Sequence, residues 1–206
     1  MILLGAYIAW LLHVHAGLDP FLTVPFAGIT LFGFGYLLQR LLLNRVIGTS
    51  LFMTLILTFG LNMVLINLNL ALFSADFRSI VMPYSALAFD WGGIRVPYTG
   101  VAVFVYALLL TLALHLFMDR TRTGQAIRAT AQNARAANVL GIGTAHIYAV
   151  SFGLGAAMAG AAGALLSALY AFSPISGESY TMKSFVIVLL GGLGSIPGVI
   201  AAGILL

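Results

Sequence analysis

The chain contains no cysteine and very little charge. Without cysteine there are no disulfides, no thiolate metal sites and no cysteine nucleophile. Only 7% of the residues are charged, whereas soluble domains average about 25%. Hydrophobic residues make up 62% of the chain and its mean hydropathy is +1.10. The composition is therefore that of an integral membrane protein.

Patterns typical of enzymes and metal sites are also missing. There is no HExxH motif and no serine, histidine and acid set. The four histidines do not form a compact metal site and are expected at interfaces or in loops: His13, His15, His115 and His146. No predicted span holds a confidently buried carboxylate, which disfavours ion-coupled secondary transport. We predict no catalytic residue, metal site or cofactor in this chain.

Apolar runs of about 20 residues are long enough to cross a bilayer as helices. We predict five such spans, near 20–39, 48–71, 97–118, 147–171 and 183–206. A partial run at 2–12 is too short to span and lacks the basic start and cleavage site of a signal peptide. The fold class is therefore an all-α bundle of transmembrane helices. We expect 1–206 to be a single transmembrane permease-type domain, truncated at both ends.

A polar island between two apolar spans, Asp119 to Gly141, carries the densest positive charge of the chain. Burial of its four arginines in the bilayer would cost about 3 kcal/mol each, so the island must lie in water or at the membrane surface. These arginines are Arg120, Arg122, Arg128 and Arg135.

A single surface helix is predicted from Gly124 to Leu140, with Thr123 capping its start and Gly141 ending it in a left-handed conformation. The spacing of four polar residues, three, four and three apart, places them on one face of this helix. They are Gln125, Arg128, Gln132 and Arg135.

If the spans alternate in direction, the chain has six arginines on one side and three basic residues on the other. The first side holds Arg40, Arg45 and the island, and the second holds Arg78, Arg95 and Lys183. The positive-inside rule then places the island in the cytoplasm. The pI is near 9.7. Because the basic residues are spread over membrane loops, contact with lipid headgroups and orientation in the membrane explain this positive charge better than a nucleic-acid partner does. The external loop Phe73–Val96, with Pro83 and Gly92-Gly93, is predicted to hold a short hairpin or an irregular lid.

Small residues stack at a spacing of four in the 147–171 span: Gly155, Ala159, Gly163 and Ser167. In lipid, such a stripe lets helix backbones approach closely.

Glycines and a proline interrupt the last apolar stretch: Gly191, Gly192, Gly194, Ser195, Pro197 and Gly198. The segment lacks the third glycine and the lysine of phosphate-binding loops, so a nucleotide site is rejected. One interpretation is a discontinuous helix beside a transport pathway, and the other is a turn that only packs.

Thr54, Thr58 and Asn62 form a polar stripe at a spacing of four, with Asn69 one heptad further on. Interhelical hydrogen bonds are the simpler explanation of this stripe. The alternative is that it faces the path of a polar solute.

The island sequence from Thr123 to Ile142 resembles the cytoplasmic loop of branched-chain amino acid ABC transporter permeases, of the type that begins the permease pair. Three further segments agree in order, so the resemblance covers nearly the whole chain. They are Leu4–Ala9, Ala156–Gly163 and Val188–Gly198.

The resemblance implies that residues 119–146 form a coupling loop that docks on a cytoplasmic ATPase. The implied docking residues are Gly124, Ala126, Arg128, Ala129, Asn133, Arg135, Ala136, Ala137 and Gly141. For Arg128 and Arg135, anchoring to anionic lipid is the simpler alternative.

The family also implies partners and a location. The partners are a second permease subunit, two ATPases that hold ATP and magnesium, and an extracytoplasmic solute-binding protein, and the location is a bacterial-type cytoplasmic (inner) membrane. The implied function is ATP-driven import of leucine, isoleucine or valine. Urea, short amides and other amino acids stay open as substrates, and so does an ATPase-independent channel or secondary carrier.

Overall fold

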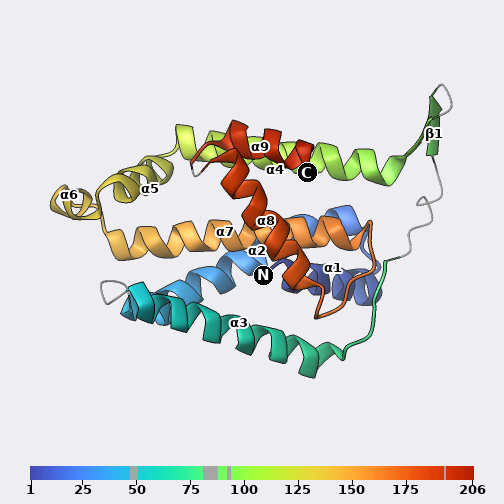
Figure 1. Cartoon of the computed structure of the whole chain (residues 1–206), viewed down its shortest axis with the longest axis horizontal. Helices are drawn as coiled ribbons and strands as arrows, with labels where there is room; N and C mark the ends of the chain where they lie inside the picture. Colours follow the sequence, from blue (N-terminus) through green and yellow to red (C-terminus); the bar gives the residue numbers. More distant parts are fainter. Residues whose placement is uncertain (47–50, 81–87, 92–93, 193) are drawn as a thin grey trace.

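The computed structural model describes residues 1–46, 51–80, 88–91, 94–192 and 194–206. Its body is helical (Figure 1). The elements follow one another as α1 (Ile2–Ala16), α2 (Pro20–Leu41), the short 3-10 helix η1 (Leu43–Arg45), α3 (Leu51–Phe73), β1 (Ala88–Trp91), β2 (Ile94–Pro97), α4 (Tyr98–Arg120), α5 (Arg122–Gln132), α6 (Ala134–Val139), α7 (Thr144–Ser167), α8 (Gly177–Gly191) and α9 (Ile196–Leu205).

Three helices, α1, α2 and α7, form the packed centre of the molecule. Helix α2 packs along α7 over the most extensive contact in the structure, and α1 lies against the last part of α7. Alanines make this closeness possible, because Ala9, Ala27 and Ala164 are fully buried at the junction of the three helices. The core is thus a layer of small side chains between backbones, as expected for helices that associate in lipid.

The turn between α1 and α2 is fixed by its sequence. Gly17 ends α1 with a φ of 62°, in the left-handed region that glycine adopts without strain. Asp19 then caps α2, since its carboxylate accepts from the Phe21 N–H at 2.9 Å, and Pro20 occupies the first helical position.

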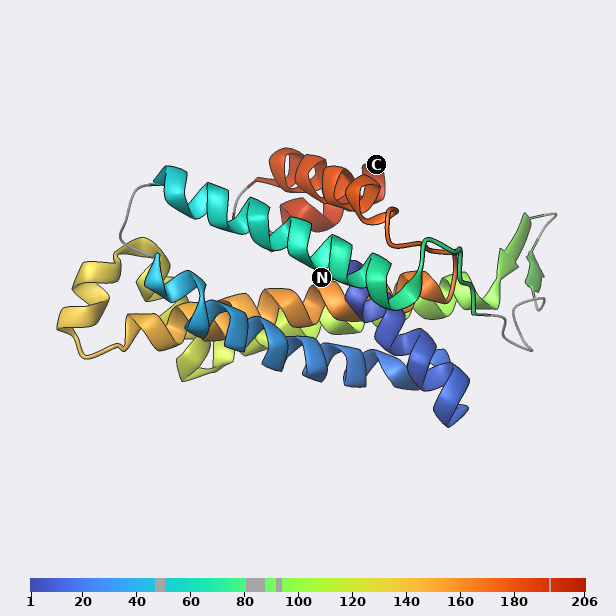
Figure 2. The same cartoon turned by 90° about the horizontal axis from the view of Figure 1, so that it is seen from below.

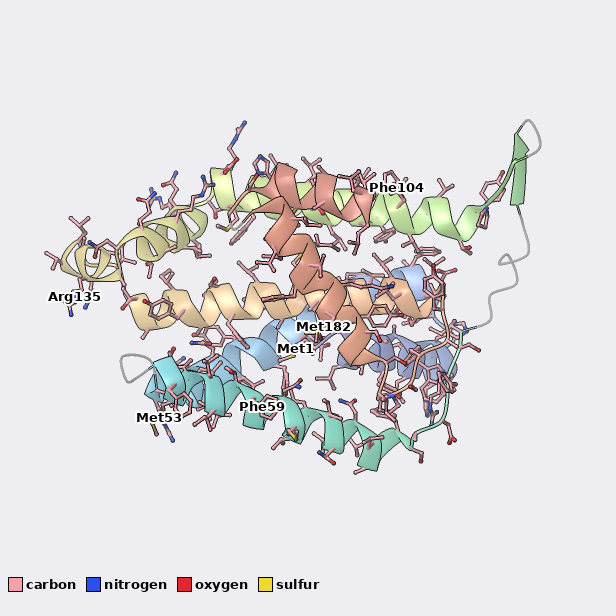
Figure 3. All side chains as sticks on the ribbon, viewed as in Figure 1. Met1, Met53, Phe59, Phe104, Arg135 and Met182 are labelled. Carbon is pink, nitrogen blue, oxygen red and sulfur yellow. The ribbon has the colours of Figure 1, made fainter. Side chains whose placement is uncertain are left out.

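Helices α3 and α4 lie outside this core, on opposite sides of it in Figure 1. Large apolar side chains project outward from both: Met53 and Phe59 on α3 and Phe104 on α4 are each more than half exposed (Figure 3). Phe21 of α2 stacks on Tyr106 of α4, at 5.8 Å between ring centroids, and Val103 and Leu110 of α4 also pack against the core. The outer faces of both helices are left for lipid or another subunit.

Among the described residues, four helices are long and apolar enough to cross a membrane. These are Pro20–Arg45, Phe52–Phe73, Tyr98–Arg120 and Thr144–Ser167. The predicted fifth span at 183–206 is divided at the predicted glycine interruption into two short helices, the end of α8 and α9. Gly192 and Gly194 adopt φ values of 83° and 93°, which stop α8, and Ser195 caps α9 by accepting from the Gly198 N–H at 3.2 Å.

The loop after α3 does contain a hairpin, formed by the antiparallel pair β1 and β2. The predicted turn residues Gly92 and Gly93, and also Pro83, lie outside the described residues. The hairpin stands at one end of the elongated molecule, and α5 and α6 stand at the other (Figures 1 and 2).

Candidate functional site

The α5–α6 segment projects beyond the ends of α2 and α7 and forms one tip of the molecule (Figure 1). It is two helices, and the single helix predicted from Gly124 to Leu140 is wrong. Asn133 breaks it with an extended backbone (φ −155°, ψ 98°) and caps α6, since its side-chain oxygen accepts from the Ala136 N–H at 3.0 Å. Asparagine competes for backbone hydrogen bonds in this way and so favours helix starts over helix interiors.

The predicted cap Thr123 lies inside α5, and Thr121 caps that helix instead. The Thr121 hydroxyl accepts from the Gly124 N–H at 3.0 Å. The turn from α4 into α5 is so tight that a Cβ on Gly124 would lie 2.4 Å from the Met118 carbonyl oxygen. Gly141 has a φ of 84°, as predicted, and the Ile142 N–H reaches back to the Ala137 carbonyl at 3.0 Å to close α6.

The break at Asn133 divides the four polar residues that were expected on one helical face, since only Arg135 of the four lies on α6. Arg128 lies on α5 and forms an ion pair with Asp119 at the end of α4. Asp119 also lies 3.2 Å from the His115 ring. Arg135 lies on α6 and is exposed at the tip (Figure 3). Arg128 therefore ties α5 to α4, whereas Arg135 faces outward.

The nine predicted docking residues divide by burial. Gly124 and Ala137 are buried, and Ala126 and Ala129 are half-buried. The exposed ones are Arg128, Asn133, Arg135, Ala136 and Gly141. The predicted set thus mixes residues that hold the loop with residues that present a surface.

Two residues of this surface were missed from the sequence. Val139 and Leu140 are 88% and 80% exposed at the end of α6, beside Arg135. Adjacent exposed apolar side chains that are surrounded by polar residues often mark a contact surface, whereas single exposed apolar residues do not. The available signal was a Val-Leu pair inside an otherwise polar, alanine-rich island.

Polar contacts fasten the base of this tip to the core. The Tyr36 hydroxyl lies 3.1 Å from His146 Nδ1, and the Asn44 amide donates to the Ala145 carbonyl at 3.0 Å. Gln39 in turn donates to the Asn44 side chain at 3.0 Å. A hollow of about 540 Å³ opens here, lined by Tyr36, Arg40, Asn44, Asn138, Gly143, Thr144, Ala145 and His146. These contacts join α2 and η1 to the start of α7, which follows directly after the tip.

The residues predicted for a pathway are not brought together. On α3, Thr54 is half-buried, while Thr58 and Asn62 are exposed, and the Thr58 hydroxyl donates to its own helix at Leu55. The other set lies at the α8–α9 junction, where a Cβ on Gly198 would meet the Gly191 carbonyl oxygen at 2.1 Å. Within the described chain, α3 packs extensively against neither α8 nor α9. The side chain of Pro197 lies outside the described residues.

The small-residue contact of α7 is real, but its register differs from the prediction. Gly155 is exposed, with nothing within 4 Å of a Cβ placed on it. Of the predicted stripe, Gly163 does make a close approach, to the Ile2 carbonyl, and Ser167 is buried, whereas the other close approach is made by Gly160, to the backbone of Gly5. Gly153 lies similarly against Phe32 of α2.

Histidines do not gather in the structure. No group of three or more potential metal ligands occurs among the residues that the structure describes. His13 and His15 bond to backbone carbonyls near the end of α1, at 2.8 and 3.1 Å.

Comparison with known proteins identifies the family of the chain. Residues 1–206 match the family described as "Branched-chain amino acid transport system / permease component". The high-affinity branched-chain amino acid transport system permease protein BraD of Pseudomonas aeruginosa is 32% identical over 99% of this chain and 71% of its own length. The LivH permease protein of Escherichia coli K12 is 41% identical over 50% of this chain and 34% of its own. A probable LivH of Methanocaldococcus jannaschii is 28% identical over 98% and 65%. No solved structure matches.

Proposed function

Because this chain belongs to the branched-chain amino acid transport system permease family, we propose that it is the membrane-spanning permease subunit of an ATP-driven importer. The family match over residues 1–206 carries the proposal. The substrates proposed are branched-chain amino acids, which the names of BraD and LivH give for those relatives. The subunit lies in the cytoplasmic (inner) membrane, with four helices long enough to span it.

In this proposal, the α5–α6 tip docks on a cytoplasmic ATPase, which supplies ATP hydrolysis with magnesium. Two such ATPases, a second permease and an extracytoplasmic solute-binding protein complete the transporter. Its support is the geometry of the tip, where Arg135, Val139 and Leu140 combine a cation with exposed apolar side chains. Such a combination suits a protein groove with an acidic rim.

Force on the tip has a physical route into the core. The Asp119–Arg128 pair joins α5 to α4, and the Tyr36–His146 and Asn44–Ala145 contacts join α2 to α7. Close backbone contacts at Gly160 and Gly163 then pass any shift of α7 to α1. The route rests on contact alone, and coupling along it awaits measurement.

The polar stripe of α3 belongs to the proposal as one wall of the solute path. Its support is exposure: Thr58 and Asn62 are exposed on a helix that is almost entirely unburied within this chain, so a second subunit has access to them. The α8–α9 junction is proposed as a deformable element beside that path, since its glycines already interrupt a helix.

Other solutes are an alternative within the same family of importers. A relative named for autoinducer 2 import, LsrC of Yersinia enterocolitica, is 34% identical over 48% of this chain. Autoinducer 2, urea, short amides and other amino acids serve as competing solutes in an assay of ATP-driven leucine uptake.

Co-purification of the full-length permease with its ATPase tests the docking surface. Arg135→Glu combined with Leu140→Asp is expected to lower ATPase recovery about tenfold or more, since interface hot spots cost 2 kcal/mol or more. Arg120→Glu is the control for the reversal at Arg135, because it makes that charge reversal at the end of α4, away from α6. Arg128→Glu is unsuitable, since it also breaks the pair with Asp119.

Equal ATPase recovery with both variants would mean that the tip is not the docking surface. If the wild type recovers no ATPase and leucine flux is independent of ATP, a channel or secondary carrier replaces the importer.

A further inference from the structure

A polar hollow lies at the base of the α5–α6 tip, where α2 ends and α7 begins (Figure 1). Its volume is about 540 Å³, and Tyr36, Arg40 and His146 line it together with Asn44 and Asn138. Sites for small ligands usually measure about 300–1,000 Å³. The contacts that join α2 to α7 leave this space open, so it has room for a ligand of its own.

Three of the lining side chains form a chain of hydrogen bonds. Arg40 Nη1 donates to the Tyr36 hydroxyl at 3.4 Å, and that hydroxyl lies 3.1 Å from His146 Nδ1. Because an arginine can only donate, the single hydroxyl hydrogen of Tyr36 is left for His146 Nδ1. The ring proton of a neutral His146 is then on Nε2. These two bonds leave the His146 Nε2–H and the other Arg40 N–H groups as donors for a ligand.

The hollow holds positive charge without a matching carboxylate. Within the described residues, Arg40 makes no ion pair. Only one acidic residue of the chain, Asp119, belongs to this end of the molecule, and Arg128 pairs with it. The other four lie at the start of α2, in the loop after α3, on β1 and at the start of α8: Asp19, Asp76, Asp90 and Glu178. An anion therefore complements the hollow.

The depth of the hollow in a membrane follows from the lengths of the two helices. Helix α2 has 22 residues and ends at Leu41, and α7 has 24 residues and begins at Thr144. Because about 20 helical residues cross a hydrocarbon core of about 30 Å, these two helix ends reach the headgroup region. Lipid phosphates are the anions that are concentrated at this depth.

A second hollow of about 520 Å³, the α7 groove, continues from the first towards the middle of α7. Gln39 of α2 and Tyr148, Phe152 and Gly155 of α7 are in its lining. Gln39 donates to Asn44, which lines the first hollow, and Tyr148 lies one turn after the start of α7. The two hollows therefore adjoin, with the polar one at the membrane surface and the α7 groove at the depth of the acyl chains.

We propose that the polar hollow binds the phosphate of an anionic phospholipid and that the α7 groove holds one of its acyl chains. Arg40 and the His146 Nε2–H donate to the phosphate oxygens. Basic pockets between transmembrane helices bind lipid headgroups in this way. The inference goes beyond the proposed function, because it requires neither a particular solute nor a docked ATPase.

Native mass spectrometry of the full-length permease complex measures this binding. Dioleoylphosphatidylglycerol and dioleoylphosphatidylcholine are titrated separately, and the Kd of the first bound lipid is compared. The two lipids have the same acyl chains and differ in net charge. Wild type is expected to bind the anionic lipid about fivefold more tightly, because it is the one that balances the charge of Arg40.

Arg40→Gln is expected to raise the Kd for phosphatidylglycerol about fivefold and to leave that for phosphatidylcholine nearly unchanged. Arg45→Gln is the matched control: it removes the same charge five residues later, at an exposed position that does not line the hollow, and its Kd is expected to stay within twofold of wild type. Equal losses in both variants would overturn the site in favour of general surface charge.

His146→Phe keeps an aromatic ring beside Tyr36 and removes the Nε2–H, so it is expected to raise the Kd for phosphatidylglycerol about threefold or more. If Arg40→Gln does not assemble, this variant decides, and a Kd equal to that of wild type would contradict the site.

Soluble phosphates identify the source of the anion. An excess of inorganic phosphate or of sn-glycerol 1-phosphate is expected to leave lipid binding nearly unchanged, because neither has an acyl chain for the α7 groove. Full displacement of the lipid would overturn the lipid assignment in favour of a soluble anion. A wild-type lipid affinity of Arg40→Gln combined with lower ATPase recovery would mean that a protein segment occupies the hollow, and it too would overturn the proposal.

Discussion

Single glycines decide how closely the helices of this protein approach each other. Gly163 and Gly155 lie on the same helix and look alike in the sequence, yet their surroundings differ completely. A Cβ on Gly163 would lie 1.9 Å from the Ile2 carbonyl oxygen, whereas a Cβ on Gly155 would meet nothing within 4 Å. Only the first glycine is required for packing.

Gly163→Ala is expected to destabilise the protein by about 1–3 kcal/mol, because backbone of α1 has to shift to admit the methyl group. Gly155→Ala is the control and is expected to change stability by less than about 0.5 kcal/mol. Thermal unfolding in detergent, followed by size-exclusion fluorescence, gives both values. Equal midpoints for the two variants would contradict the packing of α1 on α7.

At the level of elements, side-chain caps and glycine turns divide apolar or polar stretches into shorter helices. Asn133 separates α5 from α6, and the Gly192–Ser195 segment separates α8 from α9. At the second break the two helices nearly touch, since Gly191 and Gly198 lie backbone to backbone. The α8–α9 pair is therefore a hairpin whose angle depends on the absence of a side chain at residue 198.

Gly198→Val is expected to open the α8–α9 hairpin, because its Cβ would lie 2.1 Å from the Gly191 carbonyl oxygen. Gly203→Val is the control, since nothing lies within 4 Å of that position. The chain has no cysteine, so spin labels on cysteines placed at the exposed positions Leu189 and Ile204 report this pair alone. Pulsed electron resonance is expected to show a longer or broader distance only with Gly198→Val. A shift of the same size with Gly203→Val would contradict the close contact.

The whole molecule is elongated, with basic, polar residues gathered at the α5–α6 end and the hairpin at the other (Figures 1 and 3). The packed α1–α2–α7 core lies between them, and α3 and α4 flank it with exposed apolar faces. In water such faces would cause aggregation, so this arrangement requires lipid or other subunits around it. We predict that the two ends face opposite sides of a membrane.

Cysteine labelling in intact spheroplasts tests this orientation. Phe77→Cys, at a position that is 75% exposed, is expected to react with a membrane-impermeant maleimide. Arg135→Cys is expected to react only after permeabilisation, because the positive-inside rule predicts a cytoplasmic location for the arginine-rich end. The cysteine-free chain is itself the blank. Reaction of both positions in intact cells would contradict the alternating topology.

The sequence by itself determined the membrane class and most helices, because about 20 consecutive apolar residues specify a spanning helix without reference to anything distant. It also located the polar island, the hairpin after α3 and the left-handed Gly141, which are all local properties. The sequence was a poorer guide to where a helix begins, because two possible caps differ by only one hydrogen bond. Thr121 and Thr123 are both competent caps, and only the geometry of the α4–α5 turn selected Thr121.

Tertiary structure alone decided which residues share a surface. The sequence shows many small residues on α7, but the positions of α1 and α2 determine that Gly160 and Gly163, and not Gly155, form the contact. Likewise, nothing local joins Tyr7 of α1 to Phe73 of α3 and to Phe172, yet their rings pack together. Hydrophobic burial is non-directional and sets composition, whereas close packing and hydrogen bonds between distant segments depend on how whole helices are arranged.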